Sequence, residues 1–126
     1  MNLKRILLVE DDTEDQYLFT LALDSLNLNA YCKAVNNGQE ALDHLNNIAN
    51  YEIIFLDLNM PIMNGVDCLK ALKENENCRH IPVVIITTSM NPFELDNCKK
   101  MGVAHIFHKP NSFPELCKSL QSILMN

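Results

Sequence analysis

The sequence predicts an α/β fold in which a doubly wound, five-stranded parallel sheet carries five helices on its two faces. Two observations predict this fold. Short apolar runs recur along the 126-residue chain, and a helix-start signal follows each run. Strands that alternate with helices pair in parallel through right-handed crossovers, which places helices on both faces of the sheet.

The apolar runs are the expected strands. Three of them, the first, third and fourth, are almost continuously apolar, which is typical of strands covered on both faces. Each run is too short for a buried helix. The runs cover residues 6–9, 31–35, 53–56, 83–87 and 106–107.

Five capping signatures mark the expected helix starts. A side-chain oxygen at such a position accepts a hydrogen bond from an otherwise unpaired main-chain amide, and a proline is tolerated in the first turn. Five signatures in step with five strands favour the alternating pattern over chance. They are the Thr13–Gln16 capping box, Asn37, Asn64, Asn91 followed by Pro92, and Ser112.

Composition indicates one domain, spanning residues 1–126, with no second domain. Sixteen acidic against ten basic residues give a net charge of −6, which argues against binding to a nucleic-acid backbone. The partners expected for such a chain are proteins or cations. Five cysteines without a CxxC pair are typical of free thiols in a reducing cytosol, and no apolar run is long enough to cross a membrane. We therefore expect a cytoplasmic protein that contacts neither membrane nor nucleic acid directly.

Polar residues follow the apolar runs where a ligand site is expected. Asp11 and Asp12 follow the first run, Asp57 the third, Thr87 ends the fourth and Lys109 follows the fifth. The carboxyl ends of parallel strands meet at one edge, where open α/β sheets bind ligands. Three neighbouring carboxylates repel one another unless a proton or a divalent cation intervenes, and Mg²⁺ suits such oxygen ligands.

A metal at this edge gives the residues a chemical role. An ionised Asp57 can attack phosphorus and form an aspartyl phosphate. Lys109 and the Thr87 hydroxyl can then contact the phosphoryl oxygens.

At these residues the sequence resembles the receiver domain of two-component response regulators, particularly the small single-domain regulators of chemotaxis and phytochrome signalling. The resemblance covers essentially the whole chain. It is carried by Leu8-Val9-Glu10-Asp11-Asp12, Phe55-Leu56-Asp57-Leu58-Asn59-Met60-Pro61 with Asn64-Gly65, Pro82-Val83-Val84-Ile85-Ile86-Thr87 and Lys109-Pro110.

The resemblance implies a flavodoxin-like sheet of strand order 2-1-3-4-5 and a phosphorylation switch rather than an enzyme. Asp57 would accept phosphate from a histidine kinase or phosphotransfer protein, or take it from a small phosphodonor with Mg²⁺. Mg²⁺ would be held by Asp12 and Asp57 directly, by Asp11 through water and by the main-chain carbonyl of Asn59. Thr87 and Lys109 would contact the phosphoryl group, and Asn59 and Ser89 would tune its loss. The resemblance also implies a cis peptide before Pro110.

Two positions depart from the family pattern. Ile106 stands where an aromatic residue is common, and Thr88, where a smaller residue is common, is expected to narrow access to Asp57. With no effector domain expected, output would pass to a downstream protein partner. A homodimer could form through the fourth helix, fifth strand and fifth helix.

Two other functions fit an α/β chain of this size. A haloacid-dehalogenase-like phosphatase also forms an aspartyl phosphate, but its DxD motif ends the first strand, whereas Asp57-Leu58-Asn59 follows the third. A flavodoxin-like FMN carrier needs a phosphate-binding first loop, and Asp11 and Asp12 would repel the phosphate.

Overall fold

The computed structural model describes residues 4–89 and 91–125, which form a parallel sheet in the order β2-β1-β3-β4-β5. The predicted fold and strand order are confirmed. The strands are β1 (Lys4–Val9), β2 (Ala30–Val35), β3 (Ile53–Asp57), β4 (Val83–Thr87) and β5 (His105–His108). The helices are α1 (Thr13–Ser25), α2 (Gly38–Asn47), α3 (Gly65–Glu74), α4 (Pro92–Lys100) and α5 (Phe113–Leu124).

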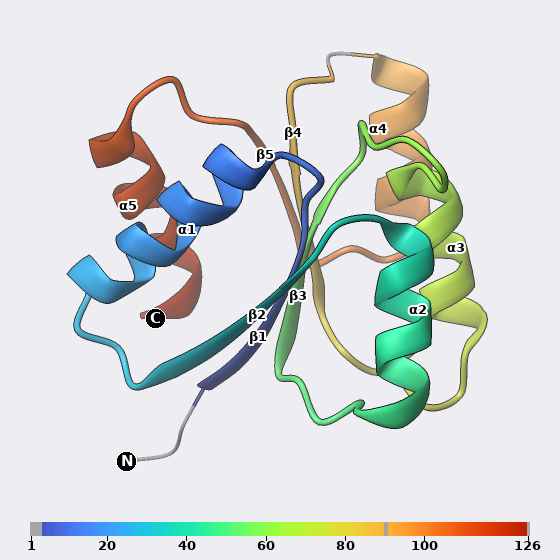
Figure 1. Ribbon diagram of the computed structural model, residues 1–126. Coiled ribbons are helices and arrows are strands. Elements are labelled where there is room, and N and C mark those ends of the chain that lie inside the picture. The colour runs from blue at the N-terminus through green and yellow to red at the C-terminus, as the bar shows by residue number, and fades with distance from the viewer. Residues whose placement is uncertain (1–3, 90, 126) are drawn as a thin grey trace.

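The sheet is the middle layer of three. Helices α1 and α5 cover one face, and α2, α3 and α4 cover the other (Figure 1). The three continuously apolar runs became β1, β3 and β4, the strands at the centre of the sheet. Such strands must be apolar on both faces because helices cover both.

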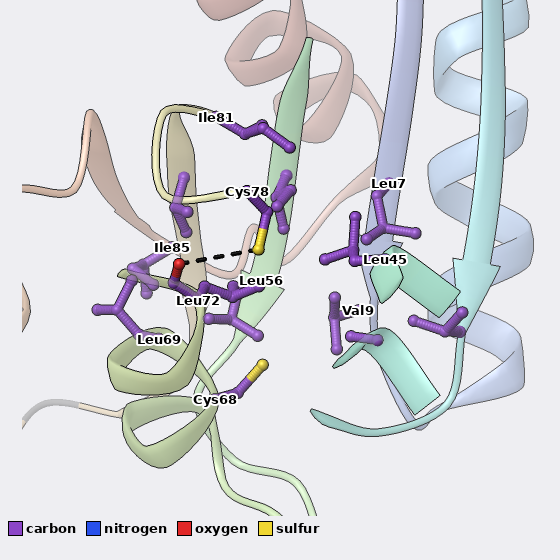
Figure 2. Close-up of a cluster of buried hydrophobic side chains, with 14 of the residues drawn as sticks. Leu7, Val9, Leu45, Leu56, Cys68, Leu69, Leu72, Cys78, Ile81 and Ile85 are labelled. Atoms are coloured by element: carbon purple, nitrogen blue, oxygen red, sulfur yellow. Dashed lines mark hydrogen bonds between the residues drawn. The ribbon is translucent and has the colours of Figure 1, made fainter. Parts of the chain in front are cut away.

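Alternate residues of the central strands belong to two separate hydrophobic cores, one on each face of the sheet. Leu7 and Leu56 point toward α2 and α3, where Cys78 donates a long hydrogen bond from Sγ to the Leu72 carbonyl at 3.8 Å (Figure 2). On the other face Phe55 meets Phe19 of α1 edge-to-face, with ring centroids 5.0 Å apart. Packing on both faces fixes the sheet and therefore the positions of the strand ends.

Four of the five helix caps are the predicted residues: Asn37, Asn64, Asn91 and Ser112. The Thr13 capping box is wrong by one position. Asp12 is the N-cap of α1, and its Oδ1 accepts the Asp15 N–H at 3.0 Å. An aspartate caps as well as a threonine does, so residue type alone does not decide between Asp12 and Thr13.

Gly65 brings α3 against the end of β3. A Cβ at this position would lie 2.4 Å from Leu58 Cα and 2.5 Å from the Asp57 carbonyl oxygen. The Gly65 N–H donates to the Leu58 carbonyl at 2.9 Å. The close approach holds the backbone of Asp57 in place.

The expected cis peptide before Pro110 is wrong, since none of the described residues has a cis peptide bond. The trans form is the lower-energy isomer of an X–Pro bond. Among the described helices, none has the length and apolar character needed to span a membrane.

Candidate functional site

Four strand ends bring polar side chains to one edge of the sheet. Glu10 follows β1, Asp57 and Thr87 are the last residues of β3 and β4, and Lys109 follows β5. Glu10, Asp57 and Thr87 are buried. Buried polar groups need partners, and the strand ends supply them.

Lys109 is the centre of an ion-pair cluster. Its Nζ lies 2.8 Å from Glu10 Oε1, 2.8 Å from Asp15 Oδ2 and 3.3 Å from Asp57 Oδ2. The predicted meeting of Asp57 and Lys109 is therefore present. A lysine ammonium has three N–H donors, and here each has a carboxylate partner.

Three carboxylates form an acidic group beside this lysine. One oxygen from each of Glu10, Asp11 and Asp57 lies within 4.8 Å of the others. Asp11 is exposed, whereas Glu10 and Asp57 are buried, so the group opens to solvent on one side. Hard oxygen donors in this arrangement suit Mg²⁺ or a similar divalent cation.

Asp12 is not a member of this acidic group. Its carboxylate caps α1 instead, as described above. The chain turns into the helix directly after it, and the cap hydrogen bond holds its side chain against the first turn. Glu10, and not Asp12, lies with Asp11 and Asp57 in this group, and the predicted part of Asp12 in holding a cation stays a prediction.

Burial and charge perturb the ionisation of the site. Burial raises the pKa of Glu10 to about 7, an effect that Asp57 reinforces and the contact with Lys109 opposes. Burial alone would lower the pKa of Lys109, but hydrogen bonds to Asp15 and Glu10 and the charge of Asp57 together raise it above its usual range. The lysine therefore stays charged at physiological pH.

The β3–α3 and β4–α4 loops meet above the phosphoacceptor candidate. The Asn59 N–H donates to Asp57 Oδ1 at 3.1 Å, and the Asn59 side-chain amide donates to Thr88 Oγ1 at 3.1 Å. The Ser89 N–H donates to the Thr87 hydroxyl at 2.9 Å. Thr88 is thus linked to the loop of Asp57, and its predicted effect on access stays a prediction.

The structure places Ile106 on one face of β5 and Phe107 on the other. Both are half-buried, Ile106 against the core beneath α2, α3 and α4 and Phe107 against the core beneath α1 and α5. An aliphatic side chain therefore packs on the α2, α3 and α4 face of β5, at the position where the family commonly has an aromatic residue.

Sequence reasoning missed two residues of this site, Glu10 and Asp15. Glu10 could have been found from the alternation of β1, because Ile6 and Leu8 face α1 and α5 and the next residue of that series is Glu10. Asp15 carries no such signal, since its partner lies 94 positions away in the chain.

A family model described as "Response regulator receiver domain" matches residues 6–121. The chain belongs to this family. It is therefore a receiver domain of the two-component response regulators, which are signalling switches, and neither a dehalogenase-like phosphatase nor a flavin carrier. Such domains are phosphorylated on an aspartate and signal by changing conformation.

Relatives from other sequences align with nearly the whole chain. A probable methanogenesis regulatory protein, FilR2 of Methanothrix harundinacea, is 31% identical over 123 residues, which are 94% of this chain and 79% of that protein. Response regulator Rcp1 of Synechocystis is 31% identical over 126 residues, covering 95% of this chain and 86% of Rcp1.

Solved structures share the fold closely. The phosphorylated cyanobacterial phytochrome response regulator RcpA matches with a TM-score of 0.89 and 28% identity, over 97% of this chain and 91% of RcpA. The Mn²⁺-bound form of Rcp1 matches with a TM-score of 0.84 and 30% identity, over 95% of this chain and 91% of that one.

Proposed function

We propose that Asp57 is the phosphoacceptor of this receiver domain. The observation that supports the proposal most is the geometry around its carboxylate: Lys109 Nζ lies 3.3 Å from Oδ2, and the carboxylates of Glu10 and Asp11 lie beside it. A buried carboxylate next to a fixed cation can attack phosphorus without a general base.

The transfer step follows from this arrangement. A carboxylate oxygen of Asp57 forms a bond to phosphorus, while the bond from phosphorus to the donor, a phosphohistidine nitrogen or the leaving oxygen of a small acyl phosphate, breaks and its electron pair leaves with the donor. Lys109 stays charged and can contact one phosphoryl oxygen. The Thr87 hydroxyl, which now accepts from Ser89, can donate to another.

Glu10, Asp11 and Asp57 would hold a divalent cation, and we propose Mg²⁺ with the Asn59 main-chain carbonyl as a further ligand. The donor set supports this assignment, because three carboxylates share one solvent-accessible group. When bound, the cation neutralises charge on the carboxylates and on the phosphoryl oxygens. Asp12 would keep its role as the cap of α1.

The direct test is incubation with Mg²⁺ and acetyl phosphate, followed by intact-mass spectrometry. We expect wild-type protein to gain the mass of one phosphoryl group and Asp57→Asn to gain none. Asp11→Asn should keep the acceptor and react more slowly. A wild-type protein that gains no mass, or an Asp57→Asn variant that gains as much as wild type, would contradict the proposal.

The partners follow from the same chemistry. We propose a sensor histidine kinase or phosphotransfer protein as the phosphate source and a protein as the downstream target. The surface of α4, β5 and α5 would carry the signal and could pair with a second copy. Phe93 on α4 supports this choice, because 85% of its surface is exposed. Solution mass with and without phosphorylation tests the pairing.

A further inference from the structure

Of the three described carboxylates that contact Lys109, only that of Asp15 lies outside the acidic group. Glu10 and Asp57 belong both to that group and to the ion-pair cluster. In the described part of the chain, the Asp15 carboxylate forms an ion pair with the lysine alone, at 2.8 Å, which is as short as the contact from Glu10. A cation shared by Glu10 and Asp57 would weaken their hold on Lys109, and the contact with Asp15 would remain.

The first turn of α1 holds Asp15 in place. Its main-chain N–H donates to Asp12 Oδ1 at 3.0 Å, which fixes the turn from which the side chain extends. The Asp15 carboxylate then crosses to Lys109, which follows β5 at the other end of the chain. The ion pair therefore links α1 directly to the β5–α5 loop.

Packing alone does not fix the lysine. A cavity of about 140 Å³ adjoins Asp15 and Lys109, and Leu18, Phe19, Phe113 and Leu116 line its apolar part. A side chain beside an open pocket can change rotamer at little steric cost. The position of the ammonium is therefore determined mainly by its carboxylate partners.

We propose that Asp15 is a positioning residue for phosphoryl transfer: it anchors Lys109 beside Asp57 when the other two carboxylates are engaged by the cation. The inference rests on the proposed function of Asp57. Asp15 would touch neither phosphate nor cation, and its contribution would be to keep the ammonium where a phosphoryl oxygen can meet it.

The test compares Asp15→Asn with Glu14→Gln. Both variants remove one negative charge from the first turn of α1, and the Glu14 side chain is exposed and absent from the ion pairs of Lys109. Two quantities are measured: the rate of phosphorylation by acetyl phosphate with Mg²⁺, and the exchange of the Lys109 ammonium protons with water, observed by NMR in unphosphorylated protein with Mg²⁺. Thermal melts establish that each variant is folded.

We expect Asp15→Asn to slow phosphorylation about tenfold and to speed ammonium exchange at least about fivefold, the size of one charged hydrogen bond. Glu14→Gln should stay within about twofold of wild type in both, because its charge is screened by solvent. Equal behaviour of the two variants in either measurement would overturn the proposal. Absence of phosphate on the wild-type protein would contradict the function of Asp57, whereas the exchange measurement judges the anchoring of Lys109 by itself.

Discussion

Replacing Glu10 with glutamine should make the metal-free protein more stable and its cation site weaker. Glu10 is 4% exposed, and its charged form is buried at a cost that the ion pair with Lys109 only partly offsets. Glutamine has nearly the same shape and no charge. The variant therefore removes the buried charge and removes one carboxylate from the acidic group.

The pKa of Glu10 gives the size and the sign of the effect. Its pKa rises from 4.5 in the unfolded chain to about 7 in the fold, and each pKa unit corresponds to about 1.4 kcal/mol, which gives about 3 to 4 kcal/mol. Between these two values the folded state binds more protons than the unfolded state, so the stability of the wild type falls as the pH rises. Below pH 4.5 this contribution is fully present, and above pH 7 it is lost.

Urea denaturation in EDTA, followed by circular dichroism because the chain has no tryptophan, measures this difference. At pH 8 we expect Glu10→Gln to exceed the wild type in unfolding free energy by up to about 4 kcal/mol, and at pH 4.5 we expect the two to agree. Adding Mg²⁺ at pH 8 should raise the unfolding free energy of the wild type. The variant should need an Mg²⁺ concentration about tenfold higher, or more, for the same increase in unfolding free energy.

Asp11→Asn is the matched control, because it removes a carboxylate of the same acidic group that is already exposed. It should weaken the response to Mg²⁺ without the gain in stability at pH 8. A Glu10→Gln variant less stable than the wild type at pH 8, or a difference in stability that does not depend on pH, would show that the buried charge of Glu10 is not destabilising.

Three further substitutions test other parts of the site. Thr88→Ala removes the acceptor of the Asn59 side-chain amide and opens the loop beside Asp57. The initial rate of phosphorylation by acetyl phosphate should therefore rise several-fold, roughly the effect of one neutral hydrogen bond. An unchanged rate would mean that this contact does not limit access to Asp57. Gly65→Ala places a Cβ against Leu58 and should lower the unfolding free energy by about 3 kcal/mol in urea, whereas a loss below about 1 kcal/mol would show that α3 can move away. Lys109→Met leaves the buried carboxylates without the lysine ammonium and should lower the unfolding free energy by about 3 kcal/mol or more in EDTA at pH 8. Mg²⁺ should restore part of this loss, and no response to Mg²⁺ would argue against a divalent-cation site.

The sheet could be predicted because its signals are local and repeated. Apolar runs of strand length marked β1, β3 and β4, and an asparagine or serine with a free side-chain oxygen marked four of the helix starts. The same pattern shows which polar residues stand at the strand ends, and for this reason Asp57, Thr87 and Lys109 were predicted as site residues. Their shared edge is a consequence of parallel pairing.

The choice among neighbouring acids could not be predicted in the same way. Asp11 and Asp12 were expected to hold the cation, but an aspartate directly before a helix can cap the helix or bind a ligand, and the two roles use the same side-chain oxygens. The path of the backbone between Val9 and Thr13 decides which role is filled. The contact between Asp15 and Lys109 depends in addition on how α1 is rotated against the sheet, which no local pattern specifies.

The most direct test of the account is a structure of the protein with Mg²⁺ and beryllium trifluoride, a mimic of the phosphoryl group. We expect beryllium to be bonded to a carboxylate oxygen of Asp57, fluorides to be contacted by Lys109 and Thr87, and the cation to lie on Glu10, Asp11 and Asp57. Beryllium on another residue, or a cation bound by Asp12 in place of Glu10, would contradict it.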